Sequence, residues 1–127
     1  MTDLPKGELT VRLVARPMDT NPAGDVFGGW ILSQMDIAGG VFCRKIAKGR
    51  VVTIAIESTT FKQPVFIGDT VSVYVNLVKQ GRTSMTVHIE TWVNRMFEAD
   101  THILVTRGDF VYVSIDENRN AKAIPVI

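Results

Sequence analysis

The pattern of apolar and polar positions divides the 127-residue chain into an early strand, one long helix and a later series of strands. Over residues 9–15 apolar and polar side chains largely alternate, which is the period of a half-buried strand. Over residues 28–48 apolar residues recur at steps of three and four, which places them on one face of a helix: Ile31, Met35, Ala38, Phe42 and Ile46. Gly49 follows this segment and is the expected C-cap of the helix.

The second half of the chain consists of β-branched runs separated by turn signals. The sequence contains no internal repeat and no linker. The order therefore predicts one α+β domain over residues 1–127, in which an antiparallel sheet packs on a single helix. The apolar runs cover residues 51–61, 63–69, 70–78, 85–94 and 102–116, and turns are expected at 79–84, 97–100 and 117–120.

The predicted helix carries more apolar side chains than one sheet can cover. Outside the main stripe lie Trp30, Leu32, Ile37, Val41 and Cys43. A helix that is apolar nearly all round is expected to be buried nearly all round. In so short a chain, the same helix of a second subunit is the simplest cover for the remaining side.

Composition and charge narrow the class of protein. The chain is 46% hydrophobic and 21% charged, with a net charge of +1, a balance typical of a soluble globular protein. Such a charge does not predict a nucleic-acid partner. The sequence has no apolar run of membrane-spanning length and no signal peptide, so a cytoplasmic protein is expected. Cys43 is the only cysteine, which excludes an internal disulfide.

The stretch "DTNPAGDVFGGW" leads into the helix and has the composition of a binding loop. A calcium loop is excluded because Ala23 and Trp30 stand where oxygen ligands are needed. A phosphate-binding P-loop is excluded because the loop lacks the terminal lysine and hydroxyl. Two interpretations of Gly28 and Gly29 remain: exposed N–H groups at the helix start, or only a tight entry. Asn21 is either functional or an Asx-turn residue.

Asp36 is the one acidic residue inside the predicted helix. At about 100° per residue it lies beside the small residues Ser33, Gly40 and Ala47. A carboxylate on a helix that should be buried is either paired, exposed at a gap or placed for chemistry. The sequence leaves these three alternatives open.

Other reactive side chains give weaker signals. His88 and His102 have no metal-binding spacing with each other or with Cys43, so no metal site is expected. His88 falls in an alternating strand, where a half-exposed ring is usual. Cys43 lies in mid-helix without a pairing histidine, which favours a packing thiol over a nucleophile.

The segment "KQGRTS" has two interpretations. It is a hairpin turn in which Gly81 is expected to adopt a positive φ. It is also a candidate anion contact, because Arg82 lies beside the hydroxyls of Thr83 and Ser84, with Lys79 nearby.

Taken together, "DTNPAGDVFGGWILSQMDIAGG", "GRVVTIAIESTTFKQPVFIGD", "QGRTSM" and "IETWV" resemble the YciA-type acyl-CoA thioesterases of the hotdog superfamily. The resemblance extends over nearly the whole chain. It implies a hotdog fold, in which a curled antiparallel sheet wraps one long central helix. It also implies a homodimer with a continuous sheet and adjacent helices, assembling further to a hexamer as a trimer of dimers. The active sites are then expected at the dimer interface.

The resemblance also implies roles for particular residues. Asp36 matches the catalytic carboxylate, acting as general base or as nucleophile on the thioester. Asn21 matches a loop amide that positions water or substrate and faces Asp36 of the opposite subunit. The amides of Gly28 and Gly29 match the oxyanion hole, and Thr60 matches a polar residue that lines the pocket. Because one base and oriented dipoles suffice for a reactive thioester, no metal or cofactor is expected.

Gly81, Arg82, Thr83 and Ser84 match the turn that meets the phosphates of coenzyme A. The sequence departs from the family pattern in "NPAG", in "TTFKQPV" and in "RMFEADTHILVTRGDF", which affects the expected acyl-chain preference and coenzyme contacts. The expected function is hydrolysis of acyl-CoA, with a role in lipid metabolism. The alternative is a non-catalytic acyl-CoA sensor on the same fold. A hotdog dehydratase would need a histidine in the helix or its entry loop, where the sequence has none.

Overall fold

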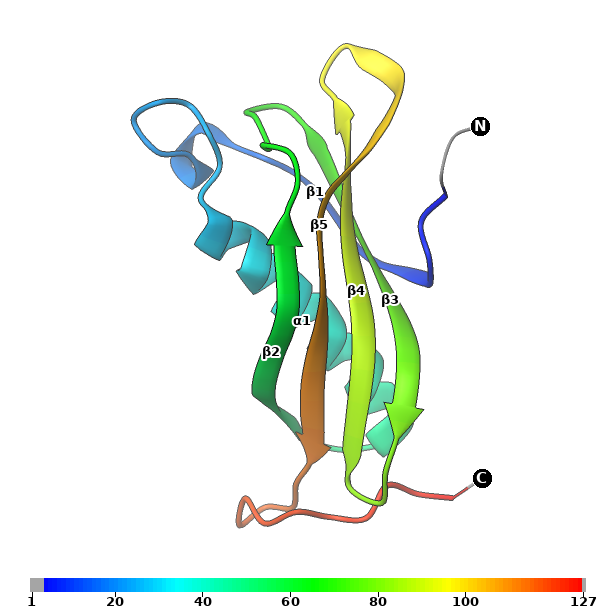
Figure 1. Cartoon of the computed structure of the whole chain (residues 1–127). Helices are drawn as coiled ribbons and strands as arrows, with labels where there is room; N and C mark the ends of the chain where they lie inside the picture. Colours follow the sequence, from blue (N-terminus) through cyan, green and yellow to red (C-terminus); the bar gives the residue numbers. More distant parts are fainter. Residues whose placement is uncertain (1–3, 127) are drawn as a thin grey trace.

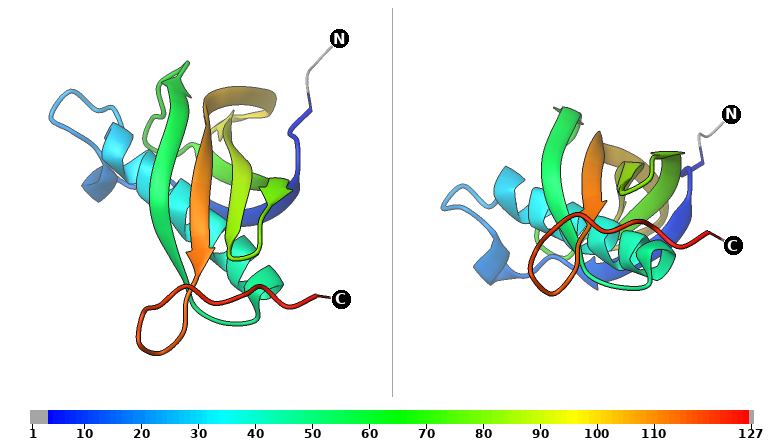
Figure 2. Two further views of the ribbon diagram at one scale, coloured as in Figure 1. Left: turned by 60° about the horizontal axis from the view of Figure 1, so that its bottom comes forward. Right: turned by 90° about the horizontal axis from the view of Figure 1, so that it is seen from below.

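A curled five-stranded sheet wraps around one long helix (Figure 1; Figure 2). The computed structural model describes residues 4–126. All neighbouring strands are antiparallel, in the order β1-β3-β4-β5-β2, which confirms the predicted α+β architecture. The elements are β1 (Glu8–Val14), the 3₁₀ turn η1 (Pro17–Asp19), α1 (Gly28–Ala47), β2 (Val51–Phe61), β3 (Thr70–Gln80), β4 (Ser84–Arg95) and β5 (Glu98–Ser114).

The helix α1 follows the predicted apolar period. Ile31, Met35 and Ala38 are buried. Phe42 and Ile46 are partly buried and pack against the core. The C-cap is Lys48 in the left-handed conformation (φ 53°), so the expectation for Gly49 is wrong. The helix ends at Ala47, two residues before the glycine. Within residues 4–126, no helix has both the length and the apolar character needed to cross a membrane.

The core lies between α1 and the concave face of the sheet. Alternate residues of the three central strands point inward, as the two-residue period of a strand requires. The register aligns them in rows, because Val87 lies opposite Phe110 and Met85 lies opposite Tyr112. The inward-facing residues that are essentially inaccessible include Val71, Val73, Val75, Met85, Val87, Ile89, Phe110 and Tyr112.

Two segments differ from the sequence prediction. Residues 63–69 form a loop between β2 and β3, not a strand, and Asp69 closes it by accepting a 2.8 Å hydrogen bond from the Phe66 amide. Gly68 has a φ of 87° there, which ends any extended run. The last hairpin turns earlier than expected, so that β5 already begins at Glu98.

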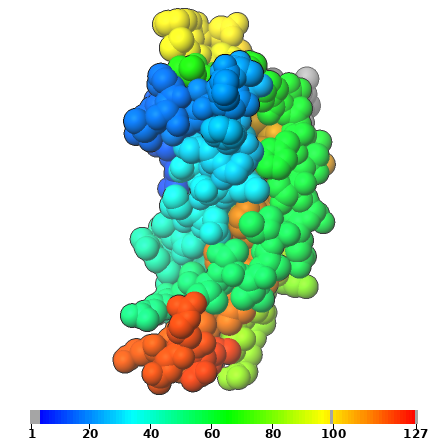
Figure 3. Space-filling model, turned by 90° about the vertical axis from the view of Figure 1, so that its left-hand side faces the viewer, coloured from blue at the N-terminus to red at the C-terminus, as the bar shows by residue number. Residues whose placement is uncertain are grey.

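One edge of the fold remains apolar and exposed. Ile54 and Ile56 on the edge strand β2 are 59% and 47% exposed, and Ile37 on α1 is 53% exposed. Figure 3 shows α1 in cyan beside β2 in green, with β5 in orange visible between them. A single chain therefore leaves this side of the helix uncovered. A second subunit as its cover stays a prediction.

Candidate active site

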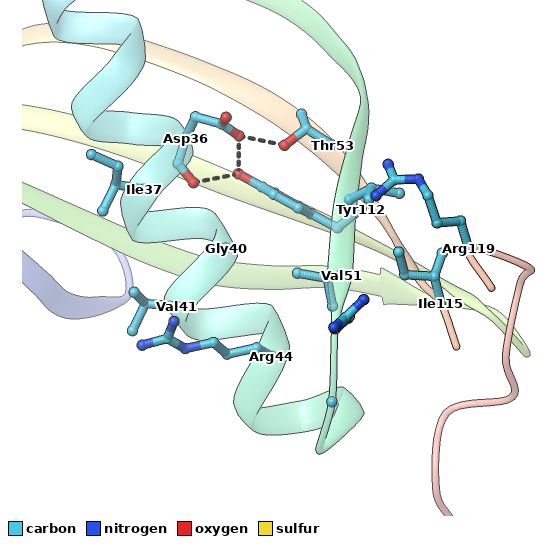
Figure 4. Close-up of a pocket in the computed structure, with 13 residues that line it drawn as sticks. Asp36, Ile37, Gly40, Val41, Arg44, Val51, Thr53, Tyr112, Ile115 and Arg119 are labelled. Atoms are coloured by element: carbon cyan, nitrogen blue, oxygen red, sulfur yellow. Dashed lines mark hydrogen bonds between the residues drawn. The ribbon is translucent and has the colours of Figure 1, made fainter. Parts of the chain in front are cut away.

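Asp36 accepts hydrogen bonds from two hydroxyl groups (Figure 4). The Thr53 hydroxyl lies 2.6 Å from Asp36 Oδ1, and the Tyr112 hydroxyl lies 2.8 Å from the same oxygen. The Tyr112 hydroxyl also lies 3.0 Å from the main-chain oxygen of Asp36. Asp36 is therefore hydrogen-bonded to two side chains, and the alternative that it is placed for chemistry stays a prediction.

The sheet register explains why these two hydroxyls meet. Thr53 on β2 lies directly opposite Tyr112 on β5, so both side chains reach α1 at the same level. Gly39 makes room for them, because a Cβ atom at this position would clash with the Tyr112 hydroxyl. Neither Thr53 nor Tyr112 stands out in the sequence, since only cross-strand pairing brings them together.

A cavity of about 1000 Å³ opens beside Asp36, between α1, the start of β2 and the end of β5. Its apolar lining includes Ile37 on α1 and Val51 at the start of β2 (Figure 4). Three arginines also line it: Arg44, Arg50 and Arg119. The cavity therefore combines a half-buried acid with an apolar wall and a cationic rim, which suits a ligand with an acyl chain and anionic groups.

The Tyr112 hydroxyl and the Cys43 thiol both have a raised pKa. Burial, followed by the hydrogen bond to Asp36, raises the pKa of the Tyr112 hydroxyl. Tyr112 is therefore a hydrogen-bond donor at neutral pH. Burial also raises the pKa of the Cys43 thiol to about 12, which agrees with its expected packing role.

Asn21 holds its own loop together. Its Oδ1 accepts hydrogen bonds from the amides of Ala23 (2.9 Å) and Asp25 (3.1 Å). Asn21 therefore forms an Asx turn, which is one of the two roles expected from the sequence. Among the described residues no bond reaches the side-chain amide nitrogen of Asn21, so its donors are free to meet another group.

Asn21 and Gly28 line a second cavity of about 500 Å³, at the start of α1. The first intrahelical bonds run from Trp30 and Ile31 to the Phe27 carbonyl. The amides of Gly28 and Gly29 precede them, as at any helix start. The space beside the Gly29 Cα is open. Within one chain, Asn21 and Gly28 therefore line the same cavity, and Asp36 lines a different one.

Thr60 lies near the far end of β2, opposite Arg107, and its side chain is exposed. It does not line the cavity that contains Asp36. In this chain the β2 hydroxyl at Asp36 belongs to Thr53, seven positions earlier.

The β3–β4 turn lies at a third cavity, of about 750 Å³. Arg82 lines it together with Lys45 and Lys48 from the end of α1. Gly81 does not have a positive φ, so that expectation is wrong; the turn is closed by its amide donating to the Ser84 carbonyl at 2.8 Å. The sequence did not indicate that two lysines would join Arg82, because they come from a distant helix.

A cluster of charged residues lies on the outer face of the sheet. His88 is half-buried, as expected, but its ring lies between Glu90 (2.8 Å) and Asp109 (3.0 Å). Trp92 donates to Glu90 at 2.9 Å. Burial alone would raise the pKa of Glu90, but hydrogen bonds from His88, Trp92 and the Lys6 amide outweigh it and lower this pKa. The contact between His88 and Asp109 links β4 to β5, and the cluster is separate from Asp36.

Residues 4–126 contain no group of three or more His, Cys, Asp or Glu side chains arranged to hold a metal ion.

Comparison with known proteins gives consistent matches. The sequence pattern of the thioesterase superfamily matches residues 23–95. The acyl-CoA thioester hydrolase YciA of Salmonella typhimurium is 43% identical over 128 residues, covering 99% of this chain and 96% of the relative. The structure is similar to the hexameric thioesterase y2039 from Yersinia pestis, with a TM-score of 0.94, 42% identity and coverage of 97% and 100%.

A hexameric hotdog-fold thioesterase of Campylobacter jejuni is a further structural match, with a TM-score of 0.86 and 43% identity. The alignment covers 94% of this chain and 91% of that one. The matches extend over the helix, the whole sheet and the loop before the helix. The chain belongs to the thioesterase superfamily and, within it, to the YciA-type thioesterases with the hotdog fold.

Proposed function

We propose that this protein hydrolyses the thioester bond of acyl-CoA, releasing a free carboxylic acid and coenzyme A. The observation that carries the proposal is the Asp36 carboxylate, held by two hydroxyls beside an apolar cavity with a cationic rim. The activity named for the Salmonella relative supports the same substrate class. Coenzyme A thioesters belong to lipid metabolism, and we propose a cytoplasmic role there.

In the proposed reaction, Asp36 takes a proton from a water molecule while the water oxygen attacks the thioester carbonyl carbon. The carbonyl oxygen becomes an oxyanion, which the amides of Gly28 and Gly29 stabilise. The tetrahedral intermediate then collapses, the carbon–sulfur bond breaks, and the coenzyme A thiolate leaves and is protonated. Alternatively, Asp36 attacks the carbonyl carbon itself, the carbon–sulfur bond breaks with release of the coenzyme A thiolate, and water then hydrolyses the resulting mixed anhydride to the free acid and the Asp36 carboxylate.

The complete site is proposed to form between two subunits. Asp36 lines one cavity, whereas Asn21 and Gly28 line another in the same chain. Pairing two chains along the exposed β2 edge would bring the loop of one subunit towards Asp36 of the other. The exposed side chains of Ile37 and Ile54 support this contact, because such apolar surface is costly to leave in water.

We further propose assembly to a hexamer as a trimer of dimers. The Yersinia and Campylobacter proteins are described as hexameric. A trimer of dimers needs a second contact surface besides the one within each dimer. Met96 and Phe97, at the tip of the last hairpin, are 55% and 90% exposed and supply apolar area suited to it.

The phosphates of coenzyme A are proposed to bind at the groove between the β3–β4 turn and the end of α1. Arg82, Lys45 and Lys48 line this groove, and the hydroxyls of Thr83 and Ser84 lie in the same turn. Guanidinium and ammonium groups form charge-assisted hydrogen bonds to phosphate oxygens.

The test is release of free thiol from short, medium and long acyl-CoAs by the parent protein and by Asp36→Asn. We expect the variant to lose about two orders of magnitude or more in kcat, the usual contribution of a general base. Asp100→Asn is the matched control, because Asp100 is exposed on the last hairpin, away from the cavity. If the parent hydrolyses no acyl-CoA, or if Asp36→Asn is as active as the parent, the proposal fails and a non-catalytic acyl-CoA sensor becomes the better description.

A further inference from the structure

The two hydroxyl groups at Asp36 converge on a single carboxylate oxygen. Thr53 and Tyr112 both bond to Oδ1, at 2.6 and 2.8 Å. Among the described residues no hydrogen bond reaches Oδ2. The carboxylate is therefore fixed through one oxygen while the other is left available for a reactant.

We propose that Tyr112 is a positioning residue for the hydrolysis, which holds Asp36 so that Oδ2 is the oxygen that accepts the proton or attacks. This inference rests on the proposed function and assigns a role beyond it. The Tyr112 hydroxyl bridges Oδ1 and the main-chain oxygen of Asp36, so it fixes the side chain relative to its own helix turn. Rotation of the carboxylate would break this bridge.

Packing alone does not account for a tyrosine at this position. The Tyr112 ring is 1% exposed and lies in an inward-facing row with Phe110 and Met85. A phenylalanine would fill the same space without burying a hydroxyl, which is unfavourable unless the hydroxyl is bonded. Both recorded bonds of this hydroxyl go to Asp36.

Gly39 permits the close approach of Tyr112 to α1. A glycine inside a helix is less favourable than alanine, because its backbone loses more conformational freedom. Here a Cβ atom would clash with the hydroxyl of Tyr112 and with the ring carbons Cζ and Cε1. The glycine therefore lets the whole ring reach α1, which brings the hydroxyl to Asp36.

The experiment measures kcat and KM of Tyr112→Phe with acyl-CoA. We expect kcat to fall about 10- to 100-fold with KM within about twofold, because the hydrogen bond to a charged group is lost. Tyr74→Phe is the matched control, since Tyr74 is the only other tyrosine and points to the outer face.

Gly39→Ala provides a second variant that keeps the tyrosine but displaces its ring and hydroxyl. It should lower kcat with little change in KM, as Tyr112→Phe does. The inference is overturned if Tyr112→Phe keeps the parental kcat, or if its loss of activity lies in KM and not in kcat. Asp36→Asn separates the two proposals: if it abolishes activity while Tyr112→Phe keeps the parental kcat, only the positioning role fails.

Discussion

Asn21 and Asp36 line different cavities of one chain, although both are expected to act on the same thioester. The Asn21 side-chain oxygen is used within its loop, so only its amide donors are free. A working site would then require Asn21 from one subunit and Asp36 from another. This arrangement can be tested without a structure of the assembly.

Mixed assemblies of two inactive variants should regain activity. We expect co-expressed Asp36→Asn and Asn21→Asp chains to recover about a quarter of the parental activity. Within hexamers that contain both chains, about half of the randomly paired dimers are mixed, and each mixed dimer has one intact site of two. The measurement is thiol release after purification through a different affinity tag on each chain.

The choice of Asn21→Asp for this experiment is deliberate. Aspartate retains the oxygen that accepts from Ala23 and Asp25 but lacks the amide donors. The loop should therefore stay folded while the donors are lost. Mixed assemblies as inactive as each variant alone would show that both residues serve a site within one chain.

Arg82 should matter for the nucleotide part of the substrate and not for the thioester. We expect Arg82→Gln to raise the KM for acyl-CoA about 5- to 50-fold with little change in kcat, as for loss of a contact made equally in ground and transition state. The comparison substrate is the corresponding acyl-pantetheine, which lacks the nucleotide phosphates. An equal effect on both substrates would contradict phosphate binding at this groove.

The β2 edge should be required for both assembly and activity. We expect Ile54→Lys to dissociate the dimer and abolish hydrolysis, since a charge on a buried interface is strongly unfavourable. Size-exclusion chromatography with light scattering measures the assembly. Val78→Lys is the control, because Val78 is 53% exposed, close to the 59% of Ile54, but lies on β3. Equal behaviour of the two variants would argue against the β2 contact.

Glu90 should stabilise the sheet in a pH-dependent manner. Its pKa is lowered from the ordinary value of 4.5 in the folded protein, so folding favours its ionised form. The stabilisation is therefore present above about pH 4.5 and is lost as the pH falls through the lower folded value. We expect Glu90→Gln to reduce the free energy of unfolding by about 1–3 kcal/mol at neutral pH.

Urea unfolding of the parent and Glu90→Gln between pH 7 and pH 3 checks this expectation. The difference between the two proteins should shrink as the pH falls below the ordinary value of 4.5. The partners are His88 at 2.8 Å and Trp92 at 2.9 Å. A constant difference across the pH range would show that the carboxylate charge is not what stabilises the cluster.

The sequence by itself determined the helix and most strands of the fold, and it singled out Asp36 as a candidate site residue. Apolar periods of 3.6 and 2 are local properties, so they placed the long helix and most strands with an error of a few residues. Asp36 stood out because it interrupts an apolar helix. Two predictions from local sequence were wrong. Lys48, not Gly49, is the C-cap of the helix, and residues 63–69 form a loop and not a strand.

Only the tertiary structure decided what surrounds Asp36. Thr53 is 17 residues away in sequence and Tyr112 is 76 residues away, yet both hydroxyls reach the same carboxylate oxygen. No local pattern encodes such contacts, because they depend on the register of β2 against β5 and on how closely α1 packs on the sheet. Gly39 permits that close approach, and its meaning becomes clear only when the Tyr112 hydroxyl is seen beside it.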